Sequence, residues 1–221
     1  MFSNSLCVIG ACIALNSGAA LAGSVDFHSD ANSTTNAAWT GASLEGTIDY
    51  SHTSGSNGVL TFSLTNNSGA SVGGFLTGIV FNIGSADANA SASLSSASDN
   101  DFKDTGAEAA NPFGMFDAGA ALKANWSGGG KPSKGLGVGA SMTLVFDIVA
   151  SDASSLTAMS FLGDGSDIAL RFRGLNNDAS DKLQGTLNDP SLTVVPLPAP
   201  VLAGGAMLGL GLGVRGLRNR K

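Results

Sequence analysis

The sequence predicts an all-β protein, with a single antiparallel β-sandwich domain over residues 23–192. Three observations predict this class. Apolar and polar residues alternate in several short runs, which is the period of a half-buried strand. Turns rich in Gly, Asn and Ser separate those runs, and no long run repeats its apolar residues at helical spacing. Several short strands joined by such turns are typical of an antiparallel β-sandwich.

The first two alternating runs predict a β-hairpin. They are residues 44–50 and 59–64, and the cluster Ser54-Gly55-Ser56-Asn57-Gly58 between them reads as the turn. The inward side chains of the pair are expected to be Leu44, Ile48, Tyr50, Leu60, Phe62 and Leu64.

Further strands are expected along the chain. His28 falls in an expected first strand, and the later strands are 75–83, 141–150, 168–172 and 192–195. At the strand 168–172, Arg171 and the following Arg173 should point outward. Residues 85–98 lack large apolar side chains and are expected to be less ordered, and 128–135 should form a loop. The expected inward residues of 141–150 and 168–172 are Met142, Leu144, Phe146, Ile148, Ile168, Leu170 and Phe172.

Composition narrows the classes of partner. The chain has 31 glycines, and charged residues make up 13%, against roughly 25% in an average soluble domain. Before residue 215 it carries seven basic and 17 acidic residues, a net charge of −10. So acidic a domain repels phosphate backbones, which argues against a nucleic-acid partner.

The first 22 residues have the pattern of a removable signal peptide. The short apolar run 6–15 is followed by Ala20-Leu21-Ala22, a small-x-small site, so cleavage is expected before Gly23. The run is too short to span a bilayer as an anchor. The alternative is a lipoprotein signal with Cys12 acylated. The two cysteines, Cys7 and Cys12, both lie in this segment, so the mature domain would have no thiol nucleophile and no thiolate metal ligand.

Residues 193–221 have three parts in order. The first is Val195-Pro196-Leu197-Pro198-Ala199, whose prolines favour extended backbone. The second is the uncharged run 197–214, about 27 Å long as a helix, close to the ~30 Å hydrocarbon core of a membrane. The third, 215–221, is a tail expected to stay cytoplasmic, and its basic residues are Arg215, Arg218, Arg220 and Lys221.

This arrangement resembles the PEP-CTERM sorting signal, and specifically its VPLPA-CTERM variant, which Val195, Pro196, Leu197, Pro198 and Ala199 match position by position. The Pro-Glu-Pro of the main type is absent, which indicates a different subtype of sorting enzyme. An ordinary tail anchor is the alternative. More loosely, residues 135–148 and 171–182 resemble strand-and-loop features of the β domains in such proteins.

The resemblance implies an exported protein that is anchored transiently in the inner membrane. An exosortase-type transpeptidase would then process it and pass it to the cell surface, outer envelope or extracellular matrix. Its partners would be that enzyme, the membrane before processing, and extracellular polysaccharide.

Candidate chemistry is sparse. The two histidines, His28 and His52, stand in no recognisable nucleophile motif. The carboxylates of 99–104 and 164–167 fall short of a calcium-loop pattern. We therefore predict no catalytic residue, no cofactor and no metal site.

Three functions follow in order of preference. The first is a non-catalytic surface or matrix protein associated with exopolysaccharide. The second is a carbohydrate- or calcium-binding adhesion module, which an exposed pair such as Trp39 and Trp126 on one sheet face would favour. The third is a secreted hydrolase, which would need His28 or His52 beside Ser and Asp.

Overall fold

A computed structural model describes residues 23–163 and 167–188, which form strands joined by turns and short 3-10 helices. The strands are β1 (Gly23–Ser29), β2 (Leu44–Ser54), β3 (Asn57–Asn66), β4 (Gly73–Phe81), β5 (Ser91–Ala97), β6 (Phe102–Asp104), β7 (Glu108–Ala109), β8 (Met115–Phe116), β9 (Ala118–Leu122), β10 (Ser141–Val149), β11 (Ile168–Leu175) and β12 (Ser180–Leu187). The 3-10 helices are η1 (Ala31–Ser33), η2 (Pro132–Lys134), η3 (Ala153–Ser155) and η4 (Ala158–Phe161).

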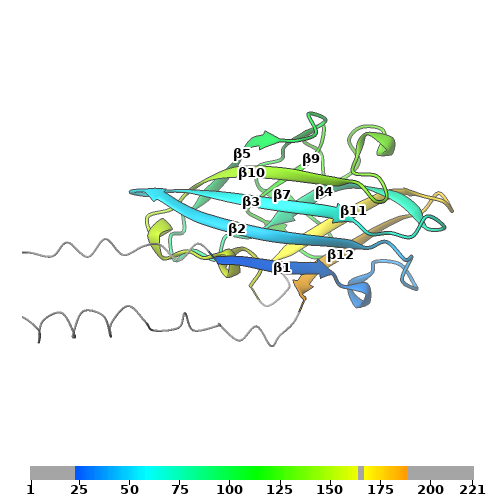
Figure 1. Ribbon diagram of the computed structural model, residues 1–221, viewed down its shortest axis with the longest axis horizontal. Helices are drawn as coiled ribbons and strands as arrows, with labels where there is room; N and C mark the ends of the chain where they lie inside the picture. The colour runs from blue at the N-terminus through cyan, green and yellow to red at the C-terminus, as the bar shows by residue number, and fades with distance from the viewer. Residues whose placement is uncertain (1–22, 164–166, 189–221) are drawn as a thin grey trace, which may run out of the picture. The chain divides into compact units, whose positions relative to one another are not determined.

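Ten strands form one antiparallel sheet in the order β5-β10-β3-β2-β1-β12-β11-β4-β9-β6 (Figure 1). The sheet curls until its edge strands approach each other, since β5 contacts both β6 and β9. Across this seam the backbone N–H of Leu94 donates to Oδ2 of Asp104 at 2.7 Å. The sheet is thus nearly closed into a barrel, and a side chain covers part of the remaining edge.

The predicted all-β antiparallel class is confirmed. The two separate sheets of a sandwich are replaced by one continuous sheet, because β1 pairs with β2 on one side and with β12 on the other. The expected lack of order in 85–98 was wrong. Its part 91–97 is strand β5, paired with β10, although its side chains are small and partly exposed.

The predicted hairpin of β2 and β3 is confirmed. Ile48 lies opposite Phe62, and Tyr50 lies opposite Leu60. Buried and exposed residues alternate along both strands and along β10, as expected for strands with one face on the core.

The core lies inside the curled sheet and centres on aromatic rings. Phe81 of β4 packs edge-on against Phe146 of β10, with ring centroids 4.9 Å apart. Phe62 of β3 contacts both rings. Rings from distant strands of the sheet therefore meet in one cluster, and such T-shaped pairs add to the energy of burial.

A smaller apolar cluster lies on the outer face of β4 and β11. Val80 and Ala169 are covered there by Phe116 and by Trp126, which is 1% exposed. Gly78 provides room for the indole, since a Cβ there would lie 3.1 Å from Cε3 of Trp126. The segment between β6 and η2 thus folds back over this part of the sheet.

The last described strand, β12, ends at Leu187, so the expected strand 192–195 lies outside the described residues. The predicted segments 1–22 and 193–221 lie outside them as well, and their boundaries stay predictions. Among the described residues, no helix has the length and hydropathy needed to cross a bilayer.

Candidate functional site

Of the predicted targeting residues, Gly23 lies within the described part, as the first residue of β1. Ala20, Ala22, the motif 195–199 and the basic tail residues fall outside it.

The two histidines lie apart and contact no serine–aspartate pair in the described residues. His28 on β1 is 2.6 Å from Oδ1 of Asn188 through its Nδ1. His52 at the end of β2 is 2.9 Å from the carbonyl oxygen of Gly55 through its Nε2. Both contacts are exposed and tie the histidines to neighbouring backbone or amide groups. Neither environment has the geometry of a hydrolytic triad.

The carboxylates between 99 and 104 accept local hydrogen bonds. Oδ1 of Asp99 accepts from the backbone N–H of Asp101 at 2.9 Å. The two oxygens of Asp104 accept from Leu94 N–H and, at 2.6 Å, from Gly106 N–H. Within 23–163 and 167–188, no group of three His, Cys, Asp or Glu residues is arranged to hold a metal ion.

The two tryptophans do not form an exposed pair. Trp39 is 52% exposed and donates its Nε1–H to the Ala42 carbonyl at 3.0 Å. Trp126 is buried in the outer apolar cluster, and its Nε1–H has no hydrogen-bond partner among the described residues. The aromatic platform that would favour sugar stacking therefore loses one of its two expected members.

A groove of about 660 Å³ runs over the outer face of β1, β2, β3 and β10. Register places Asp26, Thr47, Ser63 and Thr143 in one row across the four strands. Thr47 Oγ1 donates to Asp26 Oδ1 at 2.6 Å. The groove is lined by Asp26, Glu45, Gly46, Thr47, Ser63, Leu64, Thr65, Ser98, Ser141, Met142, Thr143 and Asn188. Its lining is thus rich in hydroxyl and carboxylate groups and has no basic residue.

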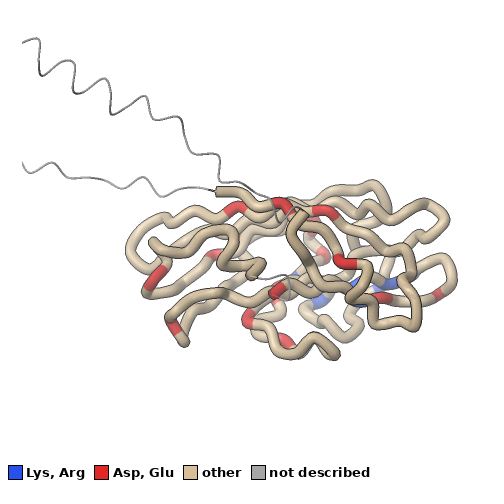
Figure 2. The backbone as a smooth tube through the Cα atoms, turned by 90° about the horizontal axis from the view of Figure 1, so that it is seen from below, with Lys and Arg blue, Asp and Glu red and all other residues tan. Residues whose placement is uncertain are grey.

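Basic residues occupy the other half of the sheet and its loops. In Figure 2 they gather in one part of the tube, whereas acidic residues are spread along it. The five strands from β5 to β1 in the sheet order carry none. The seven in the described part are Lys103, Lys123, Lys131, Lys134, Arg171, Arg173 and Lys182.

Three of these cations anchor loops to β11 and β12. Arg171 donates to the Trp126 carbonyl, Arg173 to the Gly129 carbonyl at 3.0 Å, and Lys182 to the Asn111 carbonyl. Burial lowers the pKa of Arg171, and neighbouring Arg173 lowers it further. Burial and then Arg171, its register neighbour, lower the pKa of Lys182. Arg171, Arg173 and Lys182 therefore hold these loops against the sheet.

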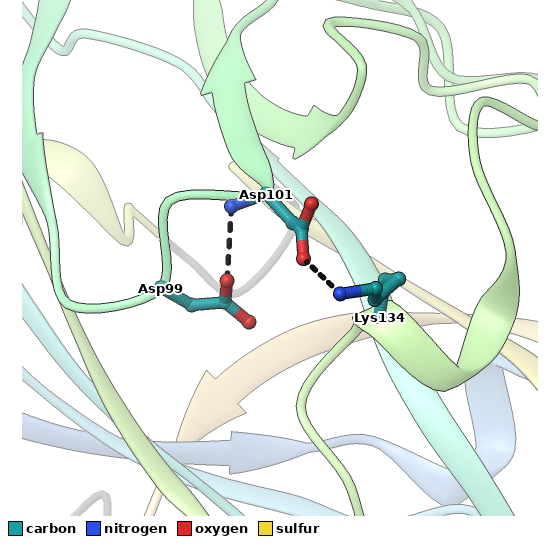
Figure 3. Close-up of polar contacts among 3 residues, drawn as sticks. All are labelled: Asp99, Asp101 and Lys134. Carbon is teal, nitrogen blue, oxygen red and sulfur yellow. Dashed lines mark hydrogen bonds and ion pairs between the residues drawn. The ribbon is translucent and has the colours of Figure 1, made fainter.

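A second, smaller cleft of about 290 Å³ lies where β9 ends. Three lysines line it, together with Asp101, Leu122 and Gly130. Lys134 Nζ is 3.2 Å from Asp101 Oδ2, the contact drawn in Figure 3. It is the one ion pair in the described part of the chain. The two other lysines, Lys123 and Lys131, are exposed and have no carboxylate in ion-pair contact.

Sequence reasoning missed both concave sites. The groove depends on which strands become neighbours in the sheet. For example, β3 pairs with β10, and their paired residues Thr65 and Ser141 are 76 positions apart in the sequence. The cleft had a weak signal in the sequence, since three of the domain's seven basic residues, Lys123, Lys131 and Lys134, fall within twelve positions. Their convergence required the loop geometry.

Comparison with known proteins adds no relative: no family model, no curated protein and no solved structure matches this chain.

Proposed function

We propose that the chain is an exported cell-surface or extracellular-matrix protein, sorted and processed by an exosortase-type enzyme, non-catalytic, and associated with extracellular polysaccharide. The observation that carries the proposal is Val195-Pro196-Leu197-Pro198-Ala199, followed by an uncharged run and a basic tail. The proposed signals flank a β domain without cysteine, and an exported domain of this size can bury enough core to fold without disulfides.

The local chemistry supports a non-catalytic role. His28 and His52 bond to an amide and a carbonyl group, and the carboxylates near Asp101 accept local N–H groups or pair with lysine. Hydrolysis requires a nucleophile, a base and an orienting acid in contact.

The fate of the tail tests the proposal. The full chain is produced in a host that has a matching sorting enzyme and in one that lacks it, and the intact mass of the exported form is measured. We expect a mass ending near 195–200 only where the enzyme is present. A mass that retains Lys221 in both hosts would instead identify a plain membrane anchor.

A matched pair of variants sharpens this test. Pro196→Ala with Pro198→Ala changes the motif, whereas Pro190→Ala changes a proline outside it. The motif variant should keep its tail in the host with the enzyme, and the Pro190 variant should lose it. If both variants are processed equally, the prolines of the motif are not needed for processing.

A second candidate is an adhesion module that binds neutral carbohydrate. The groove over β1, β2, β3 and β10 favours it, because rows of hydroxyl and carboxylate groups offer hydrogen bonds to sugar hydroxyls. Replacing Thr47 and Ser63 by Val and Ala should abolish binding to a neutral glycan array if this groove is used. The same changes at Thr61 and Ser51, outside the lining, are the control.

A further inference from the structure

We propose that the cleft at the end of β9 binds the carboxylate of an acidic sugar residue in a polysaccharide, through Lys123, Lys131 and Lys134. The proposal deepens the association with polysaccharide and rests on it for the source of the ligand. The charge of the cleft supports it. The described domain carries seven basic and fifteen acidic residues, yet three lysines share this cleft with one carboxylate, that of Asp101.

The backbone at Lys123 also supports the proposal. Lys123 and Ala124 have φ of 55° and 53°, in the left-handed region, and Asn125 N–H closes the turn onto the Leu122 carbonyl at 3.3 Å. This conformation costs an L-residue roughly 1–2 kcal/mol, and Gly or Asn adopts it more easily. A lysine here projects a charge at the cleft from a strained turn. Such strain collects at functional sites.

Lys131 and Lys134 form another part of the lining of the cleft, apart from Lys123 in the sequence. Lys134 N–H donates to the Lys131 carbonyl at 3.0 Å, around the 3-10 turn that Pro132 begins. Lys131 is the extended N-cap residue before this turn and Lys134 is the last residue of the turn, and both line the cleft. Asp101 pairs with Lys134, and Lys131 stays without a carboxylate partner among the described residues. The charge of Lys131, next to the paired Lys134, therefore favours an external anion.

The loop next to Lys131 comes close to Leu122 because the loop residues there, Gly129 and Gly130, have no side chain. A Cβ on Gly129 would lie 2.2 Å from the Leu122 carbonyl oxygen, and one on Gly130 would lie 3.2 Å from the Leu122 Cβ. Behind this loop, Arg173 Nη1 bonds the Gly129 carbonyl at 3.0 Å. The guanidinium holds the loop in place and adds positive potential on its far side.

The size and lining of the cleft indicate the ligand. At about 290 Å³ it is at the small end for binding pockets, which suits one sugar residue of a chain. Ammonium groups attract a carboxylate as point charges. The second oxygen of Asp101, drawn in Figure 3, offers an acceptor for a sugar hydroxyl. The acidic groove on β1–β3 and β10 would repel the same ligand.

Titration of the purified full-length chain with oligogalacturonate tests the proposal, with methyl-esterified oligogalacturonate as the uncharged match. We expect binding to the carboxylate form, none to the ester, and weakening as salt rises. Inorganic phosphate is a further competitor. If phosphate displaces the oligosaccharide at equal concentration, the cleft is a general anion site and the sugar assignment is wrong.

Matched lysine variants locate the binding. The double variant Lys123→Gln with Lys131→Gln should weaken the affinity for oligogalacturonate about tenfold, because the loss of each exposed charge contact should weaken it about threefold. Lys103→Gln removes an exposed lysine that does not line the cleft and should leave affinity unchanged. Equal losses in both variants, or no binding by the parent chain, would overturn the proposal. Tail processing has its own readout, by mass, so failure of sorting and failure of sugar binding are distinguishable.

Discussion

The carboxylate of Asp181 accepts a hydrogen bond from the hydroxyl of Thr40, with 2.6 Å between Oδ2 and Oγ1. Asp181 lies on β12 and is 1% exposed. The Thr34 hydroxyl and the N–H groups of Thr35 and Lys182 also donate to it, and none of the described cations pairs with it. One buried carboxyl group therefore ties Thr34, Thr35 and Thr40 to the sheet through hydrogen bonds.

Replacement of Asp181 by Asn should lower the free energy of unfolding by about 2–3 kcal/mol, because an amide group would face donors that need an acceptor. Asp178→Asn is the control, since Asp178 is exposed in the β11–β12 turn and its φ of 60° suits Asn. It should stay within about 0.5 kcal/mol. Denaturant titration measures both, and similar losses would show that the buried carboxylate has no special part.

Trp126 should dominate the stability of the outer apolar cluster. Trp126→Ala should cost about 3 kcal/mol, as large aromatic truncations in a core do, whereas Trp39→Ala at a half-exposed position should cost less than about 1 kcal/mol. The chain has two tryptophans, so Trp126→Phe leaves a single emitter. Its fluorescence should be red-shifted and readily quenched by acrylamide. A blue-shifted, protected spectrum would contradict the exposure of Trp39.

Tyr50 makes stability depend on alkaline pH. Its hydroxyl donates to the Ala153 carbonyl at 2.7 Å. Burial raises its pKa, and the Asp152 carboxylate raises it further. A group with a raised folded-state pKa contributes stability that is present below the unfolded value, about pH 10, and is lost as pH rises through the folded value.

Phenolate absorbance measures this shift directly, because Tyr50 is the single tyrosine. The folded chain should titrate at higher pH than the chain in urea. Lys182 has a lowered pKa, so its contribution has the opposite sign. The difference between wild type and Tyr50→Phe isolates the tyrosine. If the free energy of unfolding of Tyr50→Phe falls as steeply above pH 10 as that of the wild type, the assignment to Tyr50 is refuted.

Gly46 marks the tightest approach beneath the groove. A Cβ there would lie 2.5 Å from Cε1 of Phe27 and 2.9 Å from Cδ2 of Leu64. Gly46→Ala should therefore destabilise the domain by about 1–3 kcal/mol through overpacking. Gly23→Ala is the control, because a Cβ at Gly23 would have no atom within 4 Å. Equal unfolding midpoints for both variants would mean that the core accommodates the methyl group freely.

Local patterns in the sequence were enough to predict much of the sheet. The inward sets of β2, β3 and β10 follow from strict alternation, since a strand with one buried face repeats every two residues. The turn cluster 54–58 indicated the hairpin, but the turn itself lies at Gly55 and Ser56, because Asn57 and Gly58 already pair with β2. Strand β5 was missed because its pattern uses Ser and Ala, whose low hydrophobicity conceals the period.

The sequence by itself determined the alternating strands and the acidic balance, and it contains the motif 195–199 on which the proposed targeting rests, because these are encoded in neighbouring residues. Tertiary structure decided the rest. It joined β1 to β12 and so made one curled sheet, buried Trp126 over β4, and brought Lys123 to Lys131 and Lys134. Each of these depends on which distant segments share a surface, and pairing energies between distant strands leave no periodic trace in a single sequence.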